Sequence, residues 1–139
     1  MIGEAGVLIV DDEADVVQTY HQRLADSYSV QTAQSGREAL DVLDEAIDVV
    51  LLDRRMPGMS GDEVLKRIRA ENRDCQVVMV TAVDPDLDII TMEFDEYLVK
   101  PVSGAQLVET IEQLLRLDRL DTQLQRILEL GSRLATLEA

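Results

Sequence analysis

Four apolar runs in the sequence each end at a residue that can take part in chemistry. The runs are residues 7–10, 49–52, 76–80 and 96–99, and the residues that follow them are Asp11 with Asp12, Asp53, Thr81 and Lys100. Continuous aliphatic runs of this kind are typical of strands buried on both faces of a parallel sheet. The carboxyl ends of parallel strands share one edge, where open α/β sheets bind their ligands. We therefore expect these five residues to lie close together.

Carboxylates that meet at one edge repel each other unless a cation lies between them. Oxygen ligands favour a hard cation, and an incomplete protein cage that keeps some waters favours Mg²⁺ (or Mn²⁺) with phosphate oxygens as further ligands. Lys100 would add a positive charge and Thr81 a hydroxyl, which suits the oxygens of a transferring phosphoryl group. Asp53, on the central run, is then a candidate nucleophile that forms an aspartyl-phosphate. Each residue taken singly also has a structural alternative, as a strand end, a helix cap, a turn residue or a surface lysine.

The segments between the runs have the periodicity of amphipathic helices. The helices expected are residues 13–27, 35–47, 61–71, a short one at best over 85–93, and one from Ser103 onward. In the second helix, Ser35 and Glu38 form a predicted capping box, and Ile47 is expected to close the apolar stripe. Residues 28–33 carry polar positions that predict an edge strand. Strand and helix thus alternate five times, which predicts a parallel sheet covered by helices on both faces.

The motifs around these residues resemble the receiver domain of two-component response regulators. The resemblance covers about residues 5–116 and rests on five motifs: residues 8–13 (LIVDDE), 51–53 (LLD), 56–61 (MPGMSG), 80–82 (VTA) and 97–101 (YLVKP). It implies an α/β, flavodoxin-like, doubly wound five-stranded parallel sheet of strand order 2-1-3-4-5. It also implies a phosphoacceptor that is no enzyme beyond catalysing its own phosphorylation and dephosphorylation, with a sensor histidine kinase as its partner.

The resemblance assigns a role to each residue at the sheet edge. Asp53 would accept the phosphoryl group, and Asp12, Asp53 and the backbone carbonyl of Arg55 would bind Mg²⁺ directly, while Asp11 would act through water. The side chains of Thr81 and Lys100 would bind phosphoryl oxygens. A further aromatic residue, Tyr97, would be the switch that turns inward when Thr81 moves. The Lys100-Pro101 peptide bond would be cis.

The chain departs from the family pattern between the last two strands. Thr81 and Tyr97 are 16 positions apart, about three fewer than usual in the family and roughly one helical turn. Glu93-Phe94 stands where the family usually has Gly-Ala. The fourth helix is therefore expected to be short or irregular. Because this helix belongs to a face that receivers commonly use for dimers, no standard dimer mode is transferred to this chain.

Beyond the receiver region, residues 117–139 are expected to form a helical, coiled-coil-like extension. The seam consists of Leu117, Leu120, Leu124, Ile127 and Leu134 at alternating spacings of three and four, with Gly131 at the position between the last two. A helix this apolar on one side needs a partner. Folding back onto residues 1–116, a dimer helix and the start of a longer output region remain alternatives. The leucine-rich extension and the acidic receiver together resemble archaeal regulators with a HalX-type C-terminal domain.

Charge and composition narrow the class of protein. The net charge is −15, with 28 acidic and 13 basic residues, which argues against nucleic-acid binding by this segment because phosphate contacts need a basic face. Lysine occurs only at positions 66 and 100. An acidic, lysine-poor surface indicates a halophilic source as a hypothesis. No apolar run approaches about 20 residues, so we expect no membrane span. No basic, apolar leader with small residues opens the sequence, so we expect a cytoplasmic protein.

Two other functions are alternatives to that of a receiver. A magnesium-dependent phosphatase with an aspartyl nucleophile would need a second carboxylate two positions after Asp53, and that position is Arg55. A phosphorylation-independent scaffold that dimerises through the tail predicts that Asp53→Asn leaves association unchanged. The scaffold hypothesis also predicts that substitution of Leu120 or Leu124 abolishes association.

Overall fold

The fold is built on a five-stranded parallel sheet. The computed structural model describes residues 4–71 and 73–138, and describes residues 132–138 by their helical backbone alone. The strands are β1 (Gly6–Val10), β2 (Ser29–Ala33), β3 (Ile47–Leu52), β4 (Gln76–Thr81) and β5 (Glu96–Val99), and their order is β2-β1-β3-β4-β5. Every neighbouring pair is parallel. The predicted sheet, its strand order and the edge position of β2 are confirmed.

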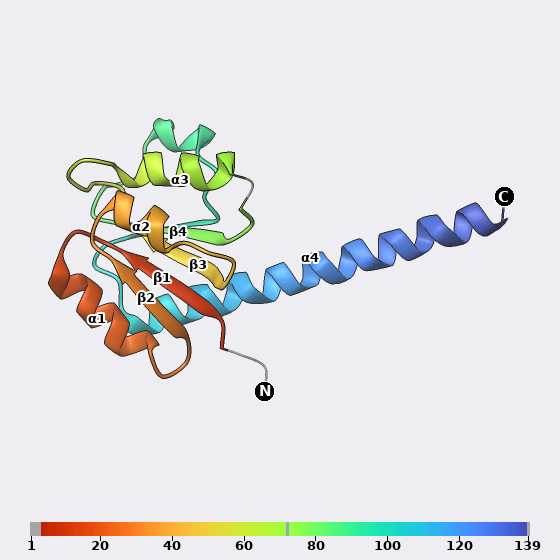
Figure 1. The fold of residues 1–139 in the computed structure, drawn as a ribbon, viewed down its shortest axis with the longest axis horizontal. Helices are drawn as coiled ribbons and strands as arrows, with labels where there is room; N and C mark the ends of the chain where they lie inside the picture. Colours follow the sequence, from red (N-terminus) through yellow and green to blue (C-terminus); the bar gives the residue numbers. More distant parts are fainter. Residues whose placement is uncertain (1–3, 72, 139) are drawn as a thin grey trace.

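Helices cover both faces of this sheet (Figure 1). They are α1 (Ala14–Leu24), α2 (Gly36–Val42), α3 (Gly61–Ala70), the 3₁₀ helix η1 (Leu87–Thr91) and α4 (Gly104–Glu138). One core joins α1 and α4 to the sheet through residues such as Leu24 and Ile111. The other core joins α2 and α3 to the opposite face through residues such as Ala39 and Ile68.

Alternate residues of β1 supply both cores, which is why this strand reads as a continuous apolar run. Val7 and Ile9 belong to the core under α1 and α4, whereas Leu8 and Val10 belong to the core under α2 and α3. Each of these side chains is at most 1% exposed, and burying one such side chain stabilises a fold by about 1.5–3 kcal/mol. A strand buried on both faces has no polar side to present to water.

Two helices begin where the sequence places a serine cap. The Ser35 hydroxyl accepts a hydrogen bond from the Glu38 amide at 3.1 Å, and the Ser60 hydroxyl accepts one from the Glu63 amide at 3.2 Å. The Glu38 carboxylate accepts from the amide of Gln34 at 3.3 Å. The two bonds to serine satisfy amides that a helix leaves unpaired in its first turn. The Gln34 amide lies before α2, so the return bond of the predicted capping box goes to Gln34 and not to Ser35.

The second helix is shorter than the sequence predicted, and the placement of Ile47 in it was wrong. Helix α2 ends at Val42 because Leu43 is extended, with φ −62° and ψ 124°. The Asp44 carboxylate then accepts a hydrogen bond from the Ala46 amide at 2.9 Å, which stabilises a turn. Ile47 follows this turn as the first residue of β3 and is buried in the core beneath α2 and α3.

The C-terminal helix is continuous across residue 116. Helix α4 packs on the sheet near its beginning and then extends away from the sheet as a single rod (Figure 1). The region between β4 and β5 contains only the five-residue 3₁₀ helix η1, in agreement with the prediction of a short fourth helix. In the described part of the chain, no helix is long and apolar enough to cross a membrane.

Candidate functional site

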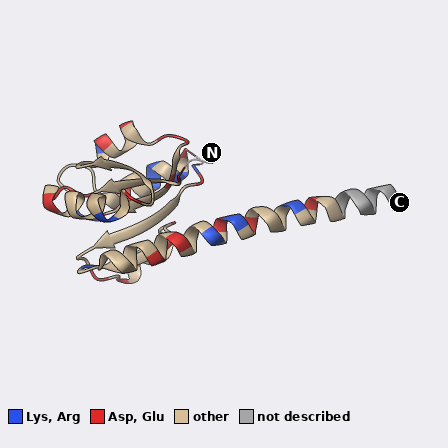
Figure 2. Cartoon of the chain, turned by 90° about the horizontal axis from the view of Figure 1, so that it is seen from below, with Lys and Arg blue, Asp and Glu red and all other residues tan. Residues whose placement is uncertain are grey.

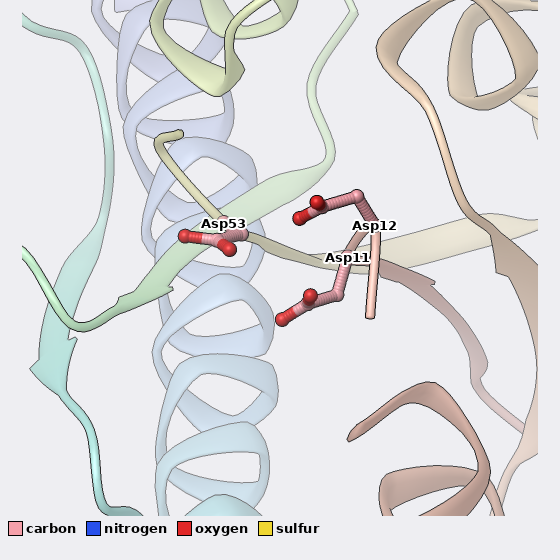
Figure 3. Close-up of side chains that lie close together, drawn as sticks. All are labelled: Asp11, Asp12 and Asp53. Carbon is pink, nitrogen blue, oxygen red and sulfur yellow. The ribbon is translucent and has the colours of Figure 1, made fainter. Parts of the chain in front are cut away.

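Three carboxylates converge at the carboxyl edge of the sheet (Figure 3). Asp11 and Asp12 follow β1, Asp53 follows β3, and one oxygen of each lies within 4.8 Å of the others. Asp11 is 2% exposed and Asp53 is 8% exposed, whereas Asp12 is open to solvent. The backbone holds Asp53 in place, because its amide donates to the carbonyl of Val10 at 3.0 Å. The sequence prediction that these residues meet is correct.

Lys100 supplies the positive charge beside these carboxylates. Its Nζ lies 2.6 Å from Oδ2 of Asp11 and 3.7 Å from Oδ2 of Asp53. Burial acts to lower the pKa of Lys100, but the hydrogen bond to Asp11 and the charges of Asp53 and Asp11 outweigh it and raise the pKa. Lys100 therefore stays protonated and offsets part of the repulsion between the two buried acids. The Lys100-Pro101 peptide bond is cis, as expected.

The carboxylates differ in how many protein hydrogen bonds they accept. Asp11 accepts from Lys100 through Oδ2 and from the Glu13 amide through Oδ1 at 2.9 Å, so the protein occupies both of its oxygens. Among the described residues, Asp12 accepts no hydrogen bond, and Asp53 has only a long 3.5 Å contact from the Arg55 amide besides Lys100. This set of hard oxygen donors fits Mg²⁺, with Asp12 and Asp53 as the carboxylates best able to bind it directly.

Thr81 ends β4 beside this cluster and is fully buried. Its hydroxyl accepts a hydrogen bond from the Val83 amide at 3.3 Å, and its carbonyl accepts one from the Lys100 amide at 2.8 Å. The second bond ties the end of β4 to the lysine. Among the described residues, the Thr81 hydroxyl donates no hydrogen bond, and its role in binding a phosphoryl oxygen stays a prediction.

Tyr97 lies inward, against the loop that follows Thr81. Its hydroxyl donates to the carbonyl of Val83 at 2.7 Å, and its ring meets Phe94 edge-on with the centroids 5.5 Å apart. The ring is half-buried and packs against the core beneath α2 and α3. The residue is thus in contact with the segment that Thr81 begins, and its role as a switch stays a prediction.

Arg54 connects the loop after Asp53 to three distant elements, and sequence reasoning missed it. Its guanidinium donates to both carboxylate oxygens of Asp62 at 3.0 and 2.9 Å, to Asp88 at 2.7 Å and to the Tyr97 hydroxyl at 3.2 Å. The hydrogen bonds to Asp62 and Tyr97 raise the pKa of Arg54 further, so the side chain is always charged. Although arginine is usually exposed, this one is only 7% exposed. Only its position next to Asp53 could have drawn attention to it.

A groove of about 390 Å³ lies between α3 and η1, next to this network. Asp62 and Asp88 form part of its wall, and Leu65 and Met92 supply apolar surface. On η1, Leu87 and Ile90 are 79% and 75% exposed. This face therefore combines apolar and charged groups beside residues that contact Tyr97.

The predicted seam lies far along α4 and is not part of the sheet-edge site. Leu117, Leu120, Leu124 and Ile127 are 53–63% exposed, and the side chain of Leu134 lies outside the described residues. The side chain of Arg55 is exposed. Its backbone carbonyl, which was predicted to bind a metal, keeps that role as a prediction.

Comparison with known proteins agrees with this geometry. The sequence profile of the response regulator receiver domain matches residues 7–112. The chain belongs to the response regulator receiver family. A protein of Haloferax volcanii, provisionally named a transcriptional regulator, is 53% identical over 113 residues, which cover 81% of this chain and 19% of that protein. The response regulator SaeR of Staphylococcus aureus is 37% identical over 115 residues, which cover 78% of this chain and 50% of SaeR. This receiver chain thus spans only a fifth to a half of these relatives.

Solved receiver structures share the fold. A CheY-like response regulator receiver domain protein from Methanospirillum hungatei superposes with a TM-score of 0.79 at 26% identity, covering 86% of this receiver and 99% of that chain. The response regulator TrrA from Thermotoga maritima was solved in complex with Mg²⁺ and BeF. It superposes with a TM-score of 0.68 at 34% identity, and the match covers 78% of this receiver and 97% of the TrrA chain.

Proposed function

We propose that this receiver is a cytoplasmic protein that accepts a phosphoryl group on Asp53 from the phosphohistidine of a sensor histidine kinase. A carboxylate oxygen of Asp53 forms the new P–O bond, the P–N bond of the phosphohistidine breaks, and the imidazole nitrogen takes up a proton. The observation that carries the proposal is the meeting of Asp53 with two further carboxylates and Lys100 at one sheet edge. Of the two buried acids, Asp53 accepts fewer protein hydrogen bonds than Asp11, so its carboxylate oxygens are more available to form a bond to phosphorus.

The same residues fit a requirement for Mg²⁺ (or Mn²⁺). Asp12, Asp53 and the carbonyl of Arg55 would bind the ion directly, and Asp11 would act through water because the protein already occupies both of its oxygens. The bound ion would neutralise charge on the phosphoryl oxygens. That TrrA was solved with Mg²⁺ and BeF supports this proposal by similarity.

Lys100 and Thr81 would bind the oxygens of the phosphoryl group. Lys100 is held by Asp11 within 3.7 Å of Asp53 and can share its charge with a group attached there. The Thr81 hydroxyl at the end of β4 can donate to a second oxygen. Fixed donors of this kind stabilise developing charge without reorganisation, so they would assist both transfer and later hydrolysis.

The signal would leave the site through Tyr97, η1 and α4. Tyr97 contacts the segment after Thr81, and Arg54 joins Tyr97 to Asp88 of η1. A phosphoryl group that moves Thr81 would therefore alter the groove between α3 and η1, where partners or a second copy would bind. With a net charge of −15, this segment would not itself bind nucleic acid.

A phosphorylation-independent scaffold is the second candidate, because one observation favours it. The seam on α4 exposes leucines that need a partner, and this need does not depend on Asp53. The phosphatase has no such support, since Arg55 stands where its second carboxylate belongs.

The test is intact mass after incubation with MgCl₂ and acetyl phosphate. We expect a gain of one phosphoryl mass that disappears in Asp53→Asn and in EDTA, while Asp15→Asn, an exposed acid of α1 outside the cluster, leaves it intact. Transfer from a phosphorylated histidine kinase of the source organism should show the same dependence. A folded protein that binds Mg²⁺ but takes up the group on another residue would refute the role of Asp53. If it neither binds Mg²⁺ nor takes up the group, the scaffold is favoured.

A further inference from the structure

The second half of α4 exposes an apolar seam on the side of the helix that faces away from its own domain. Leu107, Ile111 and Leu114 are buried against the domain. One turn further, Asp118 continues that side and lines a hollow shared with Asp48 of β3. Because each residue turns the helix by about 100°, the seam of Leu117, Leu120, Leu124 and Ile127 lies on the opposite side. In this continuous helix the seam is therefore exposed and does not pack on its own domain.

The apolar seam begins only where α4 leaves the sheet. Along the same side of the helix, the earlier residues Gln106, Glu109 and Gln113 are polar and exposed. Asp118 and Thr122 still line a hollow together with residues near the start of β3, and beyond this hollow α4 extends away from the sheet as a rod (Figure 2). A contact confined to this part would leave the sheet-edge site and the groove beside η1 open.

The seam has the heptad pattern of a coiled coil, and the charges beside it specify an orientation. With Leu117 and Leu124 at a and Leu120 and Ile127 at d, Arg116 occupies g and Asp121 occupies the e position of the following heptad. In a parallel pair in register, a g residue faces the e residue five positions later in the partner. Arg116 of each helix would therefore meet Asp121 of the other. Both side chains are exposed, and neither forms an ion pair in the part of the chain that the structure describes.

An antiparallel pair gives no such match. There, g residues face g and e residues face e, so Asp121 would face another Asp121 or Leu128. Arg116 would face another Arg116, Gln123 or Leu130. These arrangements leave charges unpaired or place like charges together, which disfavours them.

We propose that this chain forms a parallel, in-register homodimer through the seam of α4, with Arg116 of each helix paired to Asp121 of its partner. The domains then lie on the outer sides of the two helices, because each seam faces away from its own domain. This dimer is independent of the phosphoacceptor proposal, since no seam residue contacts the sheet edge in the described part of the chain. The partner that covers the leucines is a second copy of this chain.

Charge reversal tests the pairing by measuring the dimer dissociation constant of the full chain by analytical ultracentrifugation. Arg116→Glu and Asp121→Arg should each weaken the dimer by roughly 5- to 30-fold, because each places two like-charge pairs at the interface. The double variant should restore the affinity, since the pair is re-formed with its signs exchanged. Arg119→Glu and Glu129→Arg make the same charge changes at outer positions and should have little effect. A monomeric or larger wild-type assembly, or a double variant as weak as the singles, would overturn the proposal.

Disulfide cross-linking tests the orientation. Leu120→Cys and Ile127→Cys, each in a Cys75→Ala background that removes the single native cysteine, should both form dimers joined through identical positions. In an antiparallel pair, a residue lies opposite its own copy only at the midpoint of the contact. Such a pair therefore cannot form a disulfide between the two copies of position 120 and also one between the two copies of position 127. Glu129→Cys, on the outer side, should stay unlinked. Disulfide formation at only one of the two seam positions, or equal disulfide formation at position 129, would refute the parallel register. Circular dichroism checks that each variant keeps its helices.

Discussion

Arg54 donates a hydrogen bond to the Tyr97 hydroxyl at 3.2 Å, and that hydroxyl in turn donates to the carbonyl of Val83. Through these two hydrogen bonds, Arg54, which follows the candidate phosphoacceptor Asp53, is connected to the loop that follows Thr81. The Arg54 guanidinium also lies 6.0 Å from the centroid of the Tyr97 ring, within range of a cation–π contact. These contacts support the inward position of Tyr97.

Replacing Arg54 with Gln should destabilise the fold. The change removes the two-pronged contact with Asp62 and the bonds to Asp88 and Tyr97. Because both aspartates are partly exposed, we expect a loss of about 1–3 kcal/mol in the free energy of unfolding. Urea unfolding followed by circular dichroism measures it. Arg55→Gln, whose side chain is exposed, should change the value by less than about 0.5 kcal/mol. Equal effects at the two positions would show that the network contributes nothing.

Asp12→Asn should have opposite effects with and without Mg²⁺. Without the ion, removing one of three neighbouring carboxylates relieves repulsion, so the variant should unfold at a higher temperature than wild type. With the ion, binding stabilises the wild type by about 2.7 kcal/mol at a hundredfold excess over Kd, and the variant should gain little. Thermal unfolding with EDTA or millimolar MgCl₂ checks both. If the thermal unfolding midpoint of the wild type is the same with EDTA and with MgCl₂, the metal site is contradicted.

Tyr28 should contribute to a loss of stability in alkali. Burial of the ring, together with the nearby charge of Glu112, raises the pKa of its hydroxyl above the ordinary 10.0. Folding therefore favours the neutral form, so this contribution is complete below the unfolded pKa and is lost as the pH rises through the folded one. The free energy of unfolding of wild type should fall more steeply than that of Tyr28→Phe between about pH 9 and pH 12. Parallel curves would show that Tyr28 is not the group responsible.

High salt should stabilise the chain, as the hypothesis of a halophilic source requires. A net charge of −15 makes the folded state repel itself, and molar salt shortens the screening length to about 3 Å. The thermal midpoint should rise from dilute buffer to molar KCl. A variant with Asp15, Asp26 and Asp41, all exposed, changed to Asn should show a smaller rise. Equal midpoints in dilute and molar salt would count against the hypothesis.

The sequence sufficed for the sheet and for its acidic edge because those features are local. Each apolar run marks a strand, and the residue after it is at the edge whatever the rest of the chain does. The contacts of Arg54 could not be predicted from the sequence, because Asp88 and Tyr97 are 34 and 43 positions away and contact Arg54 only in the folded chain. The misplacement of Ile47 has a different cause. One apolar residue at helical spacing is equally able to begin a strand, and only the turn at Asp44 decides between them.

Gly61→Ala should damage both the fold and the candidate site, because Gly61 begins α3 directly against the backbone of Asp53. A Cβ at this position would overlap the carbonyl oxygen of Asp53 and lie 2.8 Å from its carbonyl carbon. The Gly61 amide also donates to the carbonyl of Arg54 at 2.8 Å. Relief of the overlap requires the loop after β3 to move, so we expect a loss of about 1–3 kcal/mol and slower phosphorylation by acetyl phosphate. Gly131→Ala, with open space around it, should not lower stability, because alanine favours helix by about 1 kcal/mol. Normal phosphorylation in a destabilised Gly61→Ala would separate the packing role of this glycine from any role in placing Asp53.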